Sequence, residues 1–169
     1  MFIHLNLHSV YSAMRGLLSL QDIIELAKVH RMSHLALTDV NGLWGFIRFA
    51  QQCKQANIAP IAGTNIITSN EEVVLLVENQ EGYHNLCQII SAVHDDPTIP
   101  IATLIRGKSV GLFMLAHQES VLASLVKHVP NSHLFMELRP GSQEKNVKKI
   151  ANTFGVEIVA TGDVYFREE

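Results

Sequence analysis

The side chains that could support chemistry in this sequence lie directly after short apolar segments. These positions carry imidazole, carboxylate, hydroxyl and amide groups, and they are His8 and Ser9, Thr38 and Asp39, Asn65, His117, and residues 161–163. Such groups can transfer protons, bind a metal ion or hold a polar ligand. In β/α folds, ligands bind at the carboxyl ends of the strands. If the apolar segments are strands, the sequence predicts a candidate site on one face of the fold.

Two serines close to His8 raise the question of nucleophilic catalysis. Ser9 is adjacent to the histidine, and Ser12 follows shortly after it. A serine nucleophile normally needs a base, a third acidic group that orients the base, and often a tight glycine-bounded turn. This part of the sequence has no such turn and no orienting acid, so we do not expect a serine hydrolase.

Length and composition exclude several classes of protein. A chain of 169 residues is typical of one domain with one core, so we expect a single domain over residues 1–169. We also expect a cytoplasmic protein, because no apolar run approaches the roughly 18 residues of a membrane span and no secretory signal opens the chain. Cys53 and Cys87 are isolated and predicted to be free thiols. The net charge of −3 gives no basic footprint for direct nucleic-acid binding.

The elements that must position these residues alternate along the chain. Short, nearly continuous apolar segments predict buried and largely parallel strands at residues 2–7, 34–38, 58–62, 73–77, 111–116, 134–138 and 158–161. The order of elements favours either an open doubly wound sheet or a closed barrel, and periodicity does not choose between them.

Helical patterns fill the intervals between the strands. The first begins after Ser19, whose side chain can cap it, with Asp22 near its positive end. The others are predicted at residues 43–55, 82–94, 119–127 and 142–154, the last ended by Gly155. Residues 95–100 are predicted to form a surface loop. We expect Trp44, together with Phe46 and Phe49, to pack in the core rather than to stack on nucleobases.

Several motifs resemble, in order and spacing, those of the polymerase and histidinol phosphatase (PHP) domain of bacterial DNA polymerase III alpha-like proteins, the C-family polymerases. They lie at residues 4–12 followed by Arg15 and Gly16, and at residues 36–39, 41–45 and 60–63. Residues 79–87 and 159–166 resemble the polymerase branch rather than free-standing PHP phosphatases. The resemblance implies a compact, distorted seven-stranded β/α barrel with a cluster of divalent metal ions, normally three, at its C-terminal mouth.

The resemblance also implies positions for the metal ligands, and this chain departs from several of them. Asn6 and Val40 stand where histidines are expected, Asn65 where a bridging glutamate is expected, and Tyr165 where a further histidine is expected. Valine has no lone pair, and a neutral amide lacks the charge that favours a bridge between dications. We therefore expect a relic pocket without a bound cofactor. The alternative is that one zinc or manganese ion is held by the remaining candidates, which are His8, Asp39, His117 and Asp163.

The function implied by the resemblance is association with bacterial DNA replication or error-prone DNA synthesis. With an altered metal site, we expect a non-catalytic scaffold or docking module. Its expected partners are a polymerase core in the same or a neighbouring polypeptide and a proofreading exonuclease. The alternatives are a metal-dependent phosphoesterase or 3′-5′ exonuclease with a reduced ligand set, and an independent protein that binds small molecules. The segment between His94 and Gly111 is shorter than expected for replicative enzymes, which indicates a shortened relative or one domain of a larger polypeptide.

Overall fold

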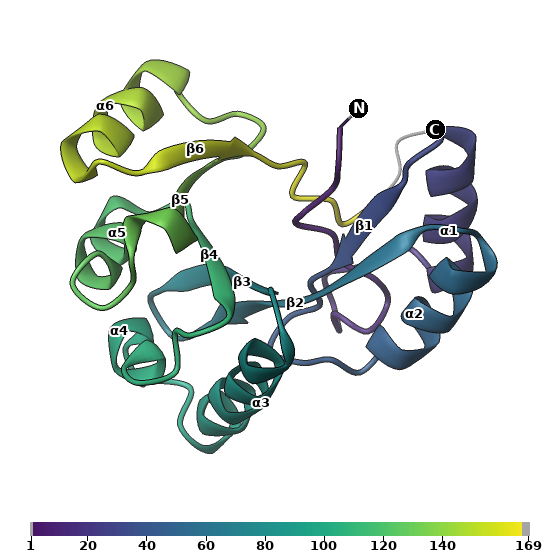
Figure 1. The fold of residues 1–169 in the computed structure, drawn as a ribbon, viewed down its shortest axis with the longest axis horizontal. Helices are drawn as coiled ribbons and strands as arrows, with labels where there is room; N and C mark the ends of the chain where they lie inside the picture. The colour runs from purple at the N-terminus through teal and green to yellow at the C-terminus, as the bar shows by residue number, and fades with distance from the viewer. Residues whose placement is uncertain (1, 167–169) are drawn as a thin grey trace.

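The computed structural model describes residues 2–166 as a curled mixed sheet with helices around its outer side (Figure 1). Six strands lie in the sheet in chain order, and they are β1 (His34–Leu37), β2 (Ala59–Ile67), β3 (Glu72–Val77), β4 (Leu112–Ala116), β5 (Leu134–Leu138) and β6 (Glu157–Ala160). Strand β3 is antiparallel to both β2 and β4, whereas the other pairs are parallel. Strand β3 is the exception to the largely parallel arrangement that was predicted, because a short turn instead of a helix connects β2 to β3.

The N-terminal segment lies between the first and the last strand of the sheet. Residues 2–7 do not form the regular strand that was predicted. On one side, the N–H groups of Ala36 and Thr38 donate to the carbonyls of His4 and Leu7. On the other side, the N–H of Val164 donates to the Asn6 carbonyl, and Leu7 and Val164 form a parallel bridge. The predicted barrel-like α/β fold is confirmed, with six regular strands and this segment in the seventh place.

The helices begin and end largely where the sequence predicts. They are α1 (Leu20–Val29), α2 (Phe46–Gln55), α3 (Gln80–Asp95), α4 (Ile101–Ile105), α5 (Glu119–Leu125) and α6 (Glu144–Phe154), with a 3₁₀ turn at Asn131–His133. Ser19 and Asp22 form a reciprocal capping box at the start of α1. Gly155 ends α6 with a left-handed φ of 65°. The short helix α4 was not predicted, since one turn shows no periodicity. In residues 2–166 no helix is long and apolar enough to cross a membrane.

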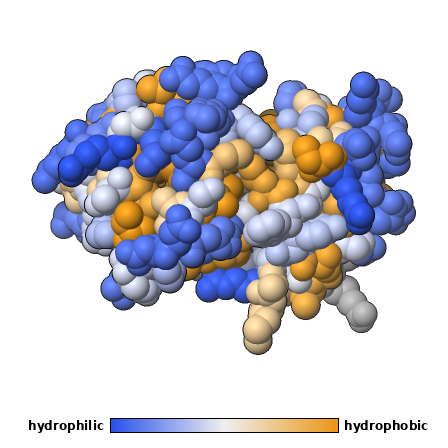
Figure 2. Space-filling model, turned by 90° about the horizontal axis from the view of Figure 1, so that it is seen from below, coloured by the Kyte–Doolittle hydropathy of each residue, from blue (hydrophilic) through white to orange (hydrophobic). Residues whose placement is uncertain are grey.

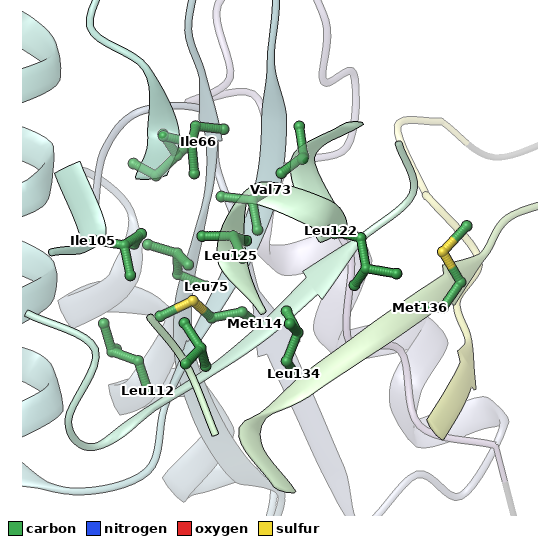
Figure 3. Packing of buried hydrophobic residues seen from close by; sticks show 14 of the residues in the cluster. Ile66, Val73, Leu75, Ile105, Leu112, Met114, Leu122, Leu125, Leu134 and Met136 are labelled. Atoms are coloured by element: carbon green, nitrogen blue, oxygen red, sulfur yellow. The ribbon is translucent and has the colours of Figure 1, made fainter. Parts of the chain in front are cut away.

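The main hydrophobic cores lie between the sheet and the helices. The larger one packs β3, β4 and β5 against α3 to α6, and Figure 3 shows side chains such as Met114 and Leu134 within it. A second cluster packs α1 and α2 against β1. Side chains alternate along a strand, so Val73 and Leu75 face the helices while Leu76 belongs to a smaller cluster on the inner face of the sheet. Helices cover the outer face, and the inner face remains to form the site.

The predicted burial of Trp44 is wrong. Its side chain is 65% exposed, whereas Phe49 is fully buried as expected. The reason is that α2 begins at Phe46 and not at residue 43, so Trp44 lies in the preceding turn, outside the helical repeat. Its ring lies edge-on to His94 with centroids 6.0 Å apart. Figure 2 shows a face of the molecule on which apolar surface reaches solvent between more polar ends.

Candidate functional site at the mouth of the barrel

The inner face of the curled sheet changes from apolar to polar towards one end, which we call the mouth. Along β5, Phe135 belongs to the inner apolar cluster, and Glu137 two residues later carries a charge. Along β6, Val159 belongs to the same cluster, and Thr161 and Asp163 follow it towards the mouth. Because strand residues two apart share one face, these polar groups converge above the apolar cluster.

Arg139 lies at the centre of the mouth. Its Nε is 2.7 Å from a carboxylate oxygen of Glu137, and its Nη2 is 2.7 Å from one of Glu72. Its Nη1 is 3.5 Å from Asp163. Burial disfavours the charged guanidinium, but the carboxylates of Glu137, Glu72 and Asp163 outweigh burial and raise the pKa of Arg139. The planar guanidinium therefore stays charged and joins three carboxylates from separate segments.

Glu137 is a fully buried carboxylate whose charge is well matched by donors. The amide Nδ2 of Asn6 donates to its Oε1 at 2.9 Å, and the Thr161 hydroxyl donates to the same oxygen at 2.7 Å. Arg139 occupies the other oxygen. The Asn6 amide also donates to Asp163 at 3.0 Å and accepts from the Thr38 hydroxyl at 3.2 Å. Asn6 is therefore held as a donor between two carboxylates.

Asn65 makes a similar contact on the other side of Arg139. Its Nδ2 donates to Glu72 at 2.8 Å, while its buried Oδ1 has no hydrogen-bond partner among residues 2–166. Burial opposes ionisation of Glu72, but hydrogen bonds from Asn65 and Arg139 and the charge of Arg139 lower its pKa. Val40 forms a parallel bridge with Asn65, and its N–H donates to the Ser12 hydroxyl. The two positions are thus neighbours on adjacent segments.

His8 is fully buried beside Asp163 and Tyr165. Its ring stacks on the Tyr165 ring with centroids 4.1 Å apart and an interplanar angle of 1°. Its Nε2 is 3.9 Å from a carboxylate oxygen of Asp163, and that nitrogen has no hydrogen-bond partner in the described part of the chain. Burial lowers the pKa of His8 to about 4. The imidazole is therefore neutral near pH 7.

Asp163 itself is in an unusual state for a carboxylate. Burial, followed by the charges of Glu137 and Glu72, raises its pKa, although Arg139 acts in the opposite direction. Its backbone has a left-handed φ of 45°, which few residues other than glycine adopt. The position is thus held by its surroundings, with His8 and Arg139 on either side of its carboxylate.

Asp39 is held by local donors and forms no hydrogen bond or ion pair with Arg139. It accepts from the N–H of Ser9 at 2.7 Å, from the Ser9 hydroxyl at 2.8 Å and from the Ser12 hydroxyl at 2.7 Å. The Ser12 hydroxyl is only 3.4 Å from His8 Nδ1, which links the two groups indirectly. Both serine hydroxyls are therefore donors to Asp39.

His117 follows β4, as predicted, and lies within electrostatic reach of the mouth. Burial and then the charge of Arg139 lower its pKa, while the carboxylates of Glu72, Glu137 and Asp163 act against this shift. Its Nδ1 is buried without a hydrogen-bond partner within residues 2–166. The structure thus places His8 beside Asp163 at the mouth, with Asp39 one hydroxyl away from His8 and His117 close enough for the charges of the mouth to act on it.

The donor set does not fit the metal cluster that the fold family implies. Over residues 2–166, no three histidine, cysteine, aspartate or glutamate side chains are arranged as they would be around a metal ion. The carboxylates point at N–H groups of Arg139, Asn6 and Asn65, and these groups have no lone pair to offer a cation.

Sequence reasoning missed the three residues that dominate the mouth, which are Glu72, Glu137 and Arg139. Glu72 begins β3 and reaches the mouth because this strand runs antiparallel, so a search at the carboxyl ends of strands could not find it. Arg139 directly follows β5, where the same search would have found it. Glu137 is the one charged residue in an otherwise apolar strand, and this was the available signal.

Comparison with known proteins agrees with this description. Residues 4–162 match the PHP domain family. The chain is 27% identical over 202 aligned positions to a DNA polymerase III subunit alpha of Pasteurella multocida, covering 99% of this chain and 17% of that protein. It is 38% identical over 94 residues to an error-prone DNA polymerase of Symbiobacterium thermophilum, covering 55% of this chain and 9% of that protein. The chain thus spans less than a fifth of these relatives.

Solved structures show the same fold at low sequence identity. A putative metal-dependent phosphoesterase from Bifidobacterium adolescentis superposes with a TM-score of 0.66 at 11% identity, covering 99% of this chain and 88% of that one. A two-domain protein from Bacteroides vulgatus containing a predicted PHP-like metal-dependent phosphoesterase gives a TM-score of 0.69 at 12% identity, with 96% and 51% covered. With the family match over nearly the whole sequence, the chain belongs to the PHP domain family and is related to the PHP region of DNA polymerase III alpha subunits.

Proposed function

We propose that residues 1–169 form one PHP domain that has lost its metal cluster. In this proposal it serves bacterial DNA replication or error-prone DNA synthesis as a non-catalytic scaffold or docking module. The relationship to polymerase III alpha subunits and to an error-prone polymerase supports this setting. Polymerase activity is not proposed for the chain, because it spans only 9–17% of these relatives.

The observation that carries the proposal is the direction of two amide groups. The Nδ2 atoms of Asn6 and Asn65 donate to the carboxylates of Glu137, Asp163 and Glu72. Hydrolysis of a phosphodiester by two metals needs carboxylate lone pairs directed at cations about 3.5 to 4 Å apart. Here those lone pairs accept N–H groups. The carboxylates of the mouth therefore accept hydrogen bonds from protein N–H groups in the places where metal ions would need them.

Access to the candidate groups supports the same proposal. His8, Asp39 and Glu137 are at most 1% exposed, and the Tyr165 ring covers one face of the imidazole. A water molecule activated for attack would have to reach these groups together with a phosphate ester. The hydrogen bonds that Glu137 accepts from Asn6, Arg139 and Thr161 instead make one arrangement of the strand ends more stable than others.

The test is metal content together with hydrolysis by the purified full chain. After incubation with Zn²⁺ or Mn²⁺ and dialysis, we expect far less than one metal ion per chain by atomic emission. We also expect no release of product from bis(p-nitrophenyl) phosphate or from the 3′ end of single-stranded DNA beyond that seen with Asp163→Ala. Stoichiometric metal with hydrolysis that Asp163→Ala abolishes would instead establish the phosphoesterase or exonuclease alternative built on His8, Asp39, His117 and Asp163.

The proposed partners are a polymerase core and a proofreading exonuclease subunit. Binding of either partner does not require direct contact with nucleic acid. Such contact is not proposed for this chain, because its net charge of −3 does not favour binding to phosphates. Calorimetric titration of the full chain with each purified partner tests this role. Saturable binding to either supports docking, and heats of dilution with both would remove the docking half of the proposal.

A further inference from the structure

We propose that Arg139 is the resident cation of the barrel mouth, and that its guanidinium provides the charge neutralisation that bound divalent metal ions would otherwise provide. This inference rests on the proposed loss of the metal cluster and names what took its place. Arg139 is not one of the altered ligand positions, so those positions do not point to it. The inference assigns it a specific role.

The geometry is that of a cation bridging separate segments. Arg139 uses three different nitrogen atoms, Nη2 for Glu72, Nε for Glu137 and Nη1 for Asp163. These carboxylates come from the start of β3, from β5 and from the segment after β6. A bound metal ion would join strand ends in the same way. The guanidinium therefore connects the ends of β5 and β6, which pair with each other, to β3, which pairs with neither of them.

Charge explains why such a group is needed. Side-chain exposure is 0% for Glu137, 18% for Glu72, 22% for Asp163 and 13% for Arg139. Carboxylates that are buried or largely buried around one guanidinium would repel one another without that cation between them. The neutral donors Asn6, Asn65 and Thr161 provide hydrogen bonds but no charge. Arg139 is the cation that touches all three carboxylates in the described structure.

Lone pairs left over in the mouth provide a second, independent observation. The buried Nε2 of His8, Oδ1 of Asn65 and Nδ1 of His117 have no hydrogen-bond partner within residues 2–166. These are atoms of the kind that bind divalent cations. If Arg139 is shortened, the mouth keeps three carboxylates and these lone pairs but has no cation. The inference therefore predicts that a variant without the guanidinium gains metal binding.

The experiment compares thermal unfolding of the wild-type full chain, Arg139→Ala and Arg139→Lys, each with EDTA, Mg²⁺, Mn²⁺ or Zn²⁺. In EDTA we expect the Tm of Arg139→Ala to fall by roughly 10 °C, since removing one partner leaves buried charges uncompensated. Arg139→Lys should fall less, because the charge remains and the forked geometry is lost. Mn²⁺ or Zn²⁺ should restore much of the Tm of Arg139→Ala, with about one ion bound by calorimetry, and should leave the wild type unchanged.

Two controls make the outcome specific. Lys148→Ala removes an exposed helical ion pair with Glu144. Its Tm should stay close to that of the wild type in EDTA and should not rise when Mn²⁺ or Zn²⁺ is added. Arg139→Ala combined with Asp163→Ala should lose the recovery by metal. If Arg139→Ala does not fold, the same metal titration is made on Arg139→Gln, which keeps most of the side-chain volume.

The results separate this inference from the proposed function. Stoichiometric metal on the wild type with hydrolysis would overturn both. A metal-free wild type with an Arg139→Ala variant of unchanged Tm, or one whose lowered Tm no cation raises, would overturn only the inference about Arg139.

Discussion

The inner face of the sheet is apolar at one end and charged at the other, although the same strands form both ends. Away from the mouth, a cavity of about 440 Å³ is lined mainly by apolar side chains, among them Leu5, Leu76 and Phe135. At the mouth, Glu137 lies two residues after Phe135 on the same face of β5 and is matched by Arg139, Asn6 and Thr161. The stability of the first region depends on how much apolar area is buried and how well the side chains pack. The stability of the second depends on individual hydrogen bonds and ion pairs.

This difference teaches where the chain is tolerant of change. Apolar side chains that line an open cavity can adjust to a change of side-chain size. The loss of stability then scales with the apolar area that the substitution removes. A buried ion-pair network cannot adjust in this way, because removing one member leaves the others unpaired. We therefore expect substitutions at the mouth to cost more than substitutions of similar size in the cavity lining.

The largest effect is expected from Glu137→Ala. The substitution removes the acceptor of the Thr161 hydroxyl and one of the acceptors of Arg139 and Asn6, and it leaves the buried guanidinium less compensated. The free energy of unfolding should therefore fall by about 3 to 5 kcal/mol. Urea unfolding followed by circular dichroism measures this change. A loss below about 1 kcal/mol would mean that the network is not more sensitive than the cavity lining.

A smaller effect is expected from Leu76→Ala in the cavity lining. The side chain is 5% exposed and packs in the inner apolar cluster, so its truncation should cost about 2 to 3 kcal/mol. The loss of stability is limited because Leu76 already borders a cavity, so its truncation creates less new empty volume than in a closed core. The matched variant Val159→Leu adds volume into the same cavity and should change stability by less than about 1 kcal/mol in the same urea assay. A larger loss for Val159→Leu would show that the cavity cannot be filled.

His8 should make stability depend on pH in one direction. Its pKa in the folded chain is about 4, below the ordinary 6.5. Between pH 4 and 6.5 the unfolded chain therefore binds a proton at His8 that the folded chain does not bind. Stability from this residue is complete above pH 6.5 and is lost as the pH falls towards 4, by at most about 1.4 kcal/mol per pH unit.

The measurement is the difference between wild type and His8→Gln across this pH range. Subtraction is needed because burial also lowers the pKa of His4 and His117, which contribute with the same sign. Parallel stability curves for the two proteins would show that His8 already binds a proton in the folded chain at these pH values.

The smallest effect is expected from Lys148→Ala on the solvent face of α6. Its ion pair with Glu144 is exposed on both sides, with side-chain exposures of 61% and 64%. Such pairs are screened by water and salt, so we expect a change of less than about 0.5 kcal/mol. A loss comparable to that of Glu137→Ala would remove the distinction between buried and exposed charge in this protein.

Much of the fold could be predicted from the sequence. The cap at Ser19 and the termination of α6 at Gly155 depend on local backbone chemistry, and both are confirmed. The β/α order and the motifs of the family placed the mouth at the strand ends, where His8, Asp163 and His117 do lie. The position of Trp44 could not be predicted, because its exposure depends on where α2 begins.

The sequence by itself determined most of the helices and strands, since their periodicity and caps follow from residue types at fixed places along the chain. Only the tertiary structure decided what fills the mouth. The antiparallel direction of β3 brings Glu72 opposite Glu137, and Arg139 lies between them. Strand direction and the meeting of distant charges depend on pairing between residues as far apart as Glu72 and Arg139, and no local pattern specifies such pairing.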